Sequence, residues 1–584
     1  MQGDFILDDG INILQNHLLR VEVFNVDDFI TAALSFHDGN GSRALAMMSF
    51  AIDYWRAGGL DAAVFKQTNL LIHAVTVFCV ACFFVRLLRL GGVDERHARL
   101  GALALALAWG LHPLQVSSVL YVVQRMQTLA TLFVVLALWA YLGMRGAQMA
   151  GGRGRGHGIA MLVFWALALA SKEDAALLPL YLIVLELTVL RFRAVLPDIQ
   201  RGLKQSYLLI GVLGALAYFF VVVPHYWHWD HYPGRDFSSL ERLLTQARVL
   251  CLYLGQIVLP WPDNLPFIYD GYAVSRSLWQ PWTTLPALLA IAALLAWAFR
   301  WRNRRPLFAC GVLLFFAGHV MTSNVIALEL VFEHRNHFPL VGAVLAIGDL
   351  LVLAARRWQV TQATRRAALV AIYALLAAAT WVHAHTWGDS VRLGEKLVAL
   401  SPDSVRAWTQ LAGAHVDQYK VSKDPAALQQ AIAVTERAFA RLGSPTLASN
   451  LVIYKSLLGT VADQDWAQLF VALRNSLADS RRHKAVLLNL QNNVGRGFSI
   501  DKARVVEVTH IVASYSALSP LDHLRNAVFI FKSPYPEQSL TYFLLFARGV
   551  TPEDGNLRRI VAELRAAGHG DWASLMEQVA GKGD

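Results

Sequence analysis

The sequence predicts an all-α protein in which a polytopic transmembrane helical bundle precedes a soluble domain of α-helical repeats. Of the 584 residues, 55% are hydrophobic and only 16% are charged, and the mean hydropathy is +0.41. A soluble protein of this size needs more charge to cover its surface, so the composition excludes an ordinary soluble enzyme. From about residue 388 the sequence becomes polar and contains no further apolar run of spanning length.

Ten apolar runs have spanning or near-spanning length. They cover residues 69–88, 100–112, 126–144, 158–171, 175–190, 206–224, 283–299, 307–326, 338–355 and 367–386. The shorter runs are expected where helices meet in a bundle and end at a water-filled cavity. A further apolar stretch, 247–260, would break the alternation of sides if it spanned, so we interpret it as re-entrant or lying at the interface.

Basic residues mark one side of the membrane. The loops of that side contain Arg86, Arg89, Arg96, Arg99, Arg145, Arg153, Arg155, Arg191, Arg193, Arg201, Lys204, Arg300, Arg302, Arg304, Arg305, Arg356, Arg357, Arg365 and Arg366. The positive-inside rule makes this side cytoplasmic. These residues account for much of the net charge of +10, so the charge does not require a nucleic-acid partner.

Three regions follow from this topology. We expect a first periplasmic loop at 1–67, a transmembrane core at 68–387 whose largest periplasmic loop is 225–282, and a periplasmic helical domain at 388–584. In the last region, Trp408-x-x-Leu411-Ala412 with Ala431 and Ala438-Phe439 fits a degenerate tetratricopeptide pattern. Later helices are expected at 446–458, 464–477, 484–493, 501–517, 537–548 and 556–580. Such repeats stack into a curved surface that binds an acceptor or partner, or they form a structural cap.

An acidic pair lies at the very start of the chain. Asp8 and Asp9 occur in Phe5-Ile6-Leu7-Asp8-Asp9-Gly10, just before the apolar helices begin. Crowding or burying carboxylates at a bilayer surface costs free energy, so such a pair suggests catalysis on a lipid-borne substrate. The alternative is a solvated turn.

Other charged and aromatic residues concentrate on the same outer side. They are Asp53, Arg125, the Ser171-Lys172-Glu173-Asp174 turn, the stretch 225–232 followed by Arg242, and Glu333-His334-Arg335. Carboxylates, cations and aromatic walls together suit a substrate with an anionic phosphate, a sugar and an apolar tail.

Each of these segments also has a structural interpretation. The stretch 225–232 is equally well an aromatic belt, and a zinc site there is not favoured because no outer pattern orients its histidines. The turn at 171–174 can simply end a helical hairpin, and 333–335 can be a salt-bridged helix cap. Arg125 can snorkel towards the interface.

These segments resemble a known family. Phe5 to Asp9, Ser49-Phe50 with Asn69 and His73, His112-Pro113 and Ser171-Lys172-Glu173 are similar to the TMTC-type membrane mannosyltransferases and their bacterial relatives. Residues 242–246 and 333–336 look like the bacterial branch. This family belongs to the GT-C class, the resemblance covers about residues 5–390, and a helical-repeat tail is usual there.

The resemblance implies transfer of a monosaccharide from a polyprenyl-phosphate donor to an acceptor on the outer side. By this assignment Asp8 or Asp9 is the catalytic base, or binds a divalent cation, Mg²⁺ or Mn²⁺, where one is used. The candidates for binding the donor phosphate are Lys172, Arg335, Arg125 and Arg242. The candidates for acceptor-binding or supporting roles are Glu173, Asp174, Glu333, His334 and Asp53.

We therefore expect a multi-pass glycosyltransferase of a bacterial inner membrane, with membrane lipids around it and its active site in the periplasm. The expected acceptor is a Ser or Thr hydroxyl of an exported protein such as a pilin. Transfer to a surface glycan or lipid, or a non-catalytic envelope scaffold, are the alternatives. A transporter is less favoured, because few ionisable residues (Glu186, His319 and Asp349) lie within or near the spans and no repeated half with broken helices stands out.

The start of the chain departs from the family. The resemblance implies a transmembrane helix before the acidic loop, whereas this chain begins almost on the motif. We expect the upstream coding sequence to encode that helix, and an upstream sequence without an apolar segment contradicts this expectation.

Overall fold

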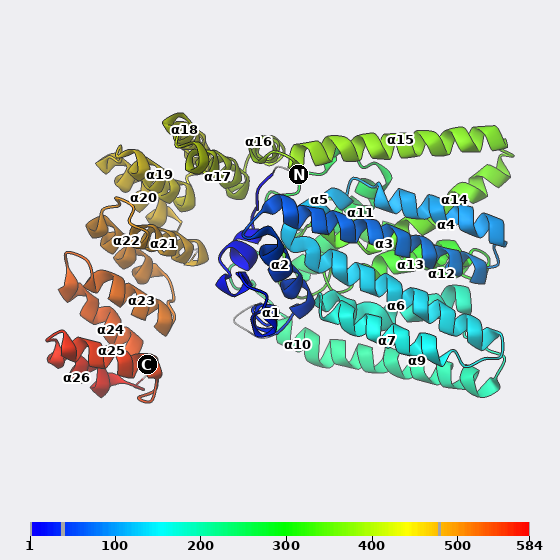
Figure 1. Ribbon diagram of the computed structural model, residues 1–584, viewed down its shortest axis with the longest axis horizontal. Coiled ribbons are helices and arrows are strands. Elements are labelled where there is room, and N and C mark those ends of the chain that lie inside the picture. The colour runs from blue at the N-terminus through cyan, green and yellow to red at the C-terminus, as the bar shows by residue number, and fades with distance from the viewer. Residues whose placement is uncertain (1–2, 37–40, 477–479, 583–584) are drawn as a thin grey trace. The chain divides into compact units, whose positions relative to one another are not determined.

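The computed structural model describes residues 3–36, 41–476 and 480–582, and all regular elements within these ranges are helical (Figure 1). This confirms the all-α class. The chain divides into two compact units, Met1–Ser401 and Pro402–Asp584. The division falls one helix later than residue 388, because α16 (Ser390–Leu400) belongs to the first unit.

The first unit contains the apolar helices and the loops between them. Its α-helices are α1 (Val26–Ala33), α2 (Ala44–Ala57), α3 (Ala62–Leu90), α4 (Glu95–Gly110), α5 (Gln115–Leu120), α6 (Arg125–Met149), α7 (Arg155–Leu169), α8 (Leu178–Leu185), α9 (Pro197–Ala217), α10 (Val223–Tyr226), α11 (Ser239–Val258), α12 (Thr284–Trp301), α13 (Pro306–His319), α14 (Pro339–Arg357), α15 (Gln362–Trp387) and α16. Short 3-10 or π segments are η1 (Gly10–Leu14), η2 (His17–Leu19), η3 (Val122–Gln124), η4 (Glu173–Leu177), η5 (Glu186–Leu190), η6 (Tyr218–Val222), η7 (Pro262–Asn264) and η8 (Glu333–Asn336).

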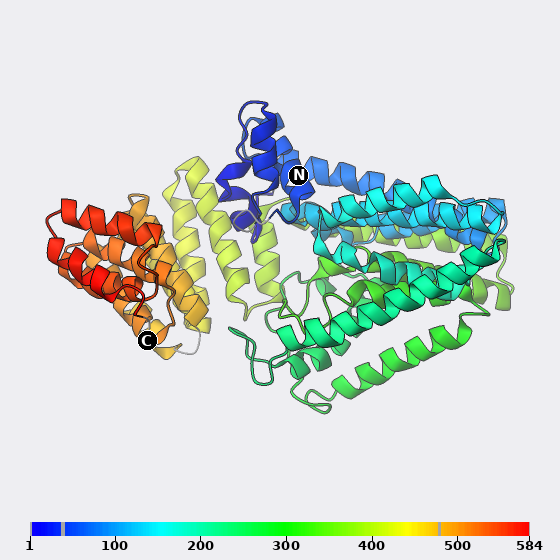
Figure 2. The same cartoon turned by 90° about the horizontal axis from the view of Figure 1, so that it is seen from below.

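The long helices of this unit run roughly parallel in a bundle (Figures 1 and 2). Each of the ten apolar runs overlaps a helix, although the run 307–326 continues beyond the end of α13 at His319. In the described part of the chain six helices are long and apolar enough to cross a membrane. They are Ala62–Leu90, Val122–Met149, Pro197–Tyr226, Thr284–Trp301, Pro339–Arg357 and Gln362–Trp387. Two shorter apolar helices, Arg155–Leu169 and Pro306–His319, accompany them. The chain is therefore a multi-pass membrane protein.

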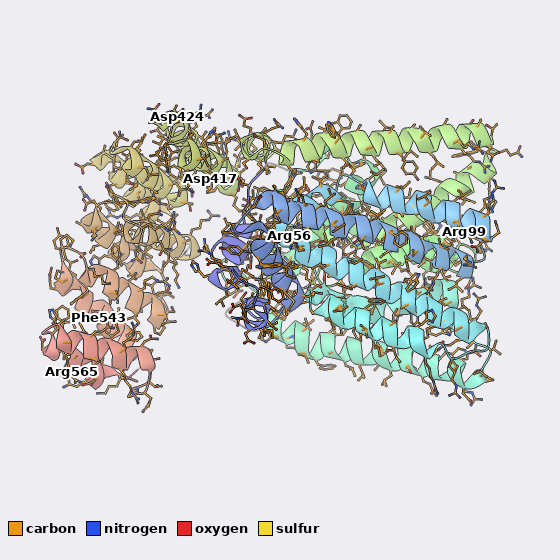
Figure 3. All side chains as sticks on the ribbon, in the orientation of Figure 1. Arg56, Arg99, Asp417, Asp424, Phe543 and Arg565 are labelled. Atoms are coloured by element: carbon orange, nitrogen blue, oxygen red, sulfur yellow. The ribbon has the colours of Figure 1, made fainter. Side chains whose placement is uncertain are left out.

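The two ends of the bundle differ in charge and structure. Arg99, at the start of α4, lies at one end, and Arg56, at the end of α2, lies at the other (Figure 3). The first loop, with α1 and α2, packs at the second end (Figure 1). Asp61 starts α3 there by accepting hydrogen bonds from the N–H groups of Ala63 and Val64, and Gly58 ends α2 with a φ of 67° that favours glycine.

The stretch 247–260 is part of α11, which is not among the helices that meet the span criteria. A capping box starts this helix, since Ser238 and Glu241 each accept a hydrogen bond from the other's backbone N–H. At its far end the carbonyl of Ile257 faces His112 Nε2 at 3.0 Å. Both ends of α11 thus contact loops rather than the basic end of the bundle.

The second unit is a series of short helices that pack on their neighbours. They are α17 (Val405–Ser422), α18 (Pro425–Leu442), α19 (Pro445–Leu458), α20 (Asp463–Asn475), α21 (Ser480–Gly495), α22 (Lys502–Tyr515), α23 (Pro520–Phe531), α24 (Ser539–Arg548), α25 (Gly555–Ala566) and α26 (Gly570–Val579), with η9 (Pro536–Gln538) before α24. The expected helix at 556–580 is two helices, because Gly568 adopts a φ of 89°. The sequence pattern missed α23. Ser519 and Asp522 form a capping box at the start of this helix.

Candidate functional site

The two neighbouring aspartates of the first loop have opposite surroundings. Asp9 is fully buried. One of its carboxylate oxygens accepts a hydrogen bond from the N–H of Ile6 at 3.0 Å, and the other accepts one from the N–H of Val123 at 2.7 Å. Burial raises the pKa of the Asp9 carboxyl to about 7, although these two bonds and nearby Lys66 lower it. Asp9 therefore attaches the loop to the start of α6.

Asp8 is exposed, and its place is fixed by its backbone. Its N–H donates to Tyr121 Oη at 2.8 Å, and Tyr121 is itself buried. Lys66 extends the attachment, since its ammonium donates to the carbonyl of Gly3. The result is one exposed carboxylate, next to the Tyr121 hydroxyl, carried on a loop that three buried side chains hold.

The aspartate pair does not fit a shared cation site. Both oxygens of Asp9 already accept backbone N–H groups, and Asp8 supplies a single exposed carboxylate. In the described residues no group of three or more His, Cys, Asp or Glu side chains has the arrangement to hold a metal ion. We therefore derive no step through Mg²⁺ or Mn²⁺.

Arg125 and Asp53 form a buried ion pair behind the loop. Their side chains approach to 2.5 Å and are almost completely buried. The Arg125 guanidinium also donates to Asn69 Oδ1 at 2.6 Å, to the carbonyl of Ser49 at 3.0 Å and to the carbonyl of Phe65 at 2.8 Å. It thus joins α2, α3 and α6, and protein groups occupy its donors in this structure.

Arg242 has a similar arrangement on the other side of the site. Its guanidinium donates to the carbonyls of Asn324 at 2.8 Å and of Thr322 at 2.9 Å, and also to the carbonyl of Leu328. These bonds hold the segment that leads into η8. The structure therefore places Arg125 and Arg242 among protein acceptors. Arg335 lies near Arg242 and also donates to carbonyls, those of Glu329 at 2.7 Å and Leu330 at 3.3 Å, but it lies near Lys172 and Arg43 as well.

The remaining cations gather near one another. Burial is the largest cause that lowers the pKa of Lys172, to about 8. Arg43 and Arg335 are close enough for their charges to lower it as well. Burial lowers the pKa of His334 well below its usual range, and the nearby charges of Lys172, Arg335 and Arg43 lower it further. His334 Nδ1 is buried and has no hydrogen-bond partner. We call Arg43, Lys172 and Arg335, together with the neutral imidazole of His334 among them, the cation cluster.

Acidic groups face the cation cluster. Glu173 accepts from Arg43 Nε at 3.0 Å and from Arg43 Nη2 at 3.0 Å. Desolvation raises the pKa of Glu173, but the bonds and charge of Arg43 outweigh it and hold that pKa below its usual range. Asp174 is near Lys172, and one of its buried carboxylate oxygens has no hydrogen-bond partner. Glu329 is a third carboxylate near the cluster, beside Arg335, so three carboxylates face the three charged side chains Arg43, Lys172 and Arg335.

Glu333 lies on the other face of η8 and is fully buried. Its Oε1 accepts from the N–H of Phe267 at 2.9 Å and from Tyr269 Oη at 3.1 Å. Burial raises the pKa of Glu333 to about 7. Phe267 has a φ of 62°, which is rare for a bulky residue and needs such contacts to persist. Glu333 therefore holds the segment 263–269 rather than the cation cluster.

The short segment from η3 into the first turn of α6 connects the acidic loop to the cation cluster. Val123 binds Asp9, Met126 Sδ accepts from Arg43 Nη1 at 3.2 Å, and Gln127 Oε1 accepts from Lys172 Nζ at 2.7 Å. Four residues of helix advance about 6 Å along the axis. Asp8 and a set of cations are thus attached to the same short piece of backbone.

Sequence reasoning assigned no role to several residues that build this site. Arg43, Tyr121 and Lys66 lie in ordinary-looking segments, and their contacts form only when distant segments pack. Lys66 carried a usable signal, since a lysine near the start of an apolar span requires a partner. The stretch 225–232 reaches the segment bound by Arg242 only at its end, where Tyr232 Oη donates to the carbonyl of Val325, and its Trp229 is 80% exposed.

Comparison with known proteins gives a partial similarity. The chain is 29% identical over 187 residues to protein O-mannosyl-transferase TMTC4 of Homo sapiens, which is 30% of this chain and 25% of the human protein. It is 30% identical over 149 residues to protein O-mannosyl-transferase TMTC4 of Mus musculus, which is 24% of this chain and 20% of the mouse protein. The chain thus spans a quarter or less of the length of these relatives. No family model and no solved structure matches it.

Proposed function

We propose that this protein is a membrane glycosyltransferase that moves a monosaccharide from a polyprenyl-phosphate donor to a hydroxyl group. The acceptor is a Ser or Thr of an exported protein, such as a pilin, on the periplasmic face of a bacterial inner membrane. The similarity to protein O-mannosyl-transferases supports the reaction class. The six apolar helices support a substrate that is carried in the membrane.

One observation carries the proposal. The loop that carries Asp8 is bound at Tyr121 and Val123, and two members of the cation cluster, Arg43 and Lys172, are bound a few residues further along the chain at Met126 and Gln127. Glycosyl transfer needs these two groups near each other, because a base must take a proton from the acceptor while cations stabilise the leaving phosphate. A scaffold has no need to keep a half-buried lysine and two arginines around a buried imidazole without a partner.

The chemistry then follows as a single displacement. The acceptor hydroxyl attacks the anomeric carbon, and the Asp8 carboxylate takes the hydroxyl proton as the new C–O bond forms. The bond from the anomeric carbon to the phosphate oxygen breaks, and its electron pair leaves with the phosphate. Arg43, Lys172 and Arg335 lie where they can neutralise the charge that develops there, and His334 can donate a hydrogen bond. Attack from the side opposite the phosphate inverts the anomeric centre.

We assign the base to Asp8 rather than to Asp9. The Asp9 oxygens are occupied by two N–H groups, so that side chain positions the loop. A transporter is disfavoured, because the ionisable groups within the bundle are already paired with each other. Glu186 pairs with Arg145 at 2.6 Å, and Asp349 pairs with Arg305 at 2.9 Å. Both pairs are explained by helix packing.

The test is the intact mass of exported proteins, pilin included, from a deletion strain. The strain is complemented with wild type, Asp8→Asn, Asp9→Asn or the control Asp27→Asn, an exposed carboxylate of the same loop. We expect wild type and Asp27→Asn to restore a sugar-sized mass increase. Asp8→Asn should lower transfer by about 10²–10⁴-fold at unchanged protein level.

Other outcomes decide between the alternatives. Protein masses that never change, with a sugar-sized change in a surface glycan or lipid, move the acceptor to that class. Full complementation of an envelope phenotype by Asp8→Asn contradicts the enzyme and favours the scaffold.

A further inference from the structure

The corner where α15 ends and α16 follows contacts both chain segments that frame the site. We define this corner as residues 387–401, the last part of the first unit. One of the two segments is the start of the chain, which carries Asp8. The other is 263–269, which Glu333 binds through the N–H of Phe267.

The contact with the start of the chain is reciprocal. The N–H of Asp4 donates to Ser390 Oγ at 3.0 Å, and Ser390 Oγ donates to Asp4 Oδ2 at 3.2 Å. The approach is close, because a Cβ atom added to Gly3 would lie 2.5 Å from the carbonyl oxygen of Trp387. Only three residues separate Asp4 from Asp8, so the corner limits where the Asp8 loop can lie.

The contact with 263–269 uses three residues of the corner. Lys396 pairs with Asp263, and its hydrogen bond and charge hold the pKa of Asp263 below its usual range. Ser401 Oγ donates to the carbonyl of Ile268 at 2.7 Å. The ring of Trp387 meets the ring of Phe267 edge-on, with centroids 4.8 Å apart.

The left-handed backbone at Phe267 makes these contacts necessary. An L-residue with a bulky side chain adopts a φ of 62° only where its surroundings compel it. On one side Glu333 accepts a hydrogen bond from the N–H of Phe267. On the other side the corner contacts the Phe267 ring and both ends of the segment 263–269. The Tyr121 ring also packs edge-on against Phe267, at 5.5 Å between centroids. Tyr121 binds the N–H of Asp8, so the two segments are coupled.

We propose that the corner 387–401 is a positioning element for the transfer reaction, in which Ser390 sets the Asp8 loop and Lys396 sets the segment 263–269. This inference rests on the proposed function for its catalytic consequence. Ser390 and Lys396 act through other residues and do not touch the substrate. Their loss should lower the turnover number and leave the KM for the lipid donor unchanged, because the cation cluster belongs to other elements.

The test is a charge reversal in the full-length protein in detergent. Asp263→Lys, Lys396→Asp and the double variant are compared with wild type by hydrogen–deuterium exchange of residues 263–269 and by transfer kinetics. We expect each single variant to raise exchange in that segment and to lower the turnover number about two- to fivefold, as fits an exposed ion pair. The double variant should restore both values to at least half of wild type.

Two further variants complete the design. Ser390→Ala should raise exchange in residues 4–10 and lower the turnover number without changing donor KM. Lys420→Asp is the matched control, because Lys420 forms an exposed pair with Asp417 at 2.6 Å within the second unit. It should change neither exchange at the two segments nor turnover.

The readouts separate the two proposals. Unchanged exchange in both segments overturns the positioning element, whatever the activity. Raised exchange with an unchanged turnover number in an active enzyme also overturns it. A wild type without transfer activity contradicts the proposed function instead. In that case the hydrogen–deuterium exchange of the two segments, and its return towards the wild-type value in the charge-swapped double variant, decides whether the corner holds them.

Discussion

Asp8 and Asp9 show how much two adjacent residues of the same type can differ once the chain is folded. Asp9 is buried between two backbone N–H groups, while Asp8 is exposed next to it. The same contrast separates the arginines: Arg125 is surrounded by acceptors from three helices, whereas Arg43 lies with Lys172 and Arg335. The residue types predicted a catalytic carboxylate and a phosphate-binding group, and the surroundings of each side chain are the basis on which we propose Asp8 for the first role and Arg43, Lys172 and Arg335 for the second.

The buried carboxyls predict a stability that depends on pH. The pKa of Asp9 is raised from 3.8 to about 7. Between these two pH values the folded state therefore keeps a proton on Asp9 that the unfolded state has already released. Its contribution therefore falls as pH rises from about 4 to 7, by roughly 4 kcal/mol in all. We expect the unfolding midpoint in detergent to fall across this range, and Asp9→Asn to reduce the fall.

Glu333 has a pKa raised to about 7 as well, so it must be separated from Asp9. Glu333→Gln should remove its own share of the pH dependence, and the double variant should remove more than either single one. A midpoint whose pH dependence is the same in wild type and in the double variant contradicts both assignments.

Lys172 gives a test of the cation cluster. Lys172→Ala removes a charge from the phosphate-binding group, so the donor KM should rise about tenfold or more. Lys172→Arg keeps the charge and should retain more affinity. The measurement is initial transfer rate against the concentration of polyprenyl-phosphate sugar, and an unchanged KM in Lys172→Ala excludes this residue from donor binding.

At the scale of single elements, the first turn of α6 has the greatest effect on the site. Val123 of η3, just before this turn, binds Asp9 through its N–H. Within the turn, Met126 and Gln127 contact Arg43 and Lys172, and Arg125 donates hydrogen bonds to α2 and α3. The sequence predicted an apolar run at 126–144 and an arginine near its start. It did not predict that this turn collects contacts from four separate segments, because each contact joins residues at least 45 positions apart.

Arg125 should therefore be important for folding. Arg125→Ala leaves Asp53 buried with fewer partners and frees several carbonyls, which should destabilise the fold by about 3–5 kcal/mol. Arg56→Ala is the matched control, because Arg56 also pairs with Asp53 at 2.9 Å but is half exposed. We expect a loss of about 1 kcal/mol or less there. The measurement is the unfolding midpoint in detergent; equal shifts in both variants contradict a structural role for Arg125.

At the scale of the whole molecule, charge asymmetry predicts the orientation. Arg56 and Arg99 lie at opposite ends of the bundle (Figure 3). A cysteine replacing Arg56, in a background without the four native cysteines, should react with a membrane-impermeant maleimide from the periplasm. A cysteine replacing Arg99 should react only after the inner membrane is permeabilised. The reverse pattern contradicts the proposed periplasmic site.

The sequence by itself determined the helical class, the membrane-embedded first unit and the helical tail, because hydrophobic runs and helix-starting residues are local signals. It also identified most of the charged segments of the site. Only the tertiary structure decided that Asp9 and Glu333 hold loops, that Arg125 and Arg242 are bound by backbone carbonyls, and that Arg43 and His334 join Lys172 and Arg335. The reason is physical: burial and hydrogen-bond partners depend on which distant segments meet, and no local pattern encodes those contacts.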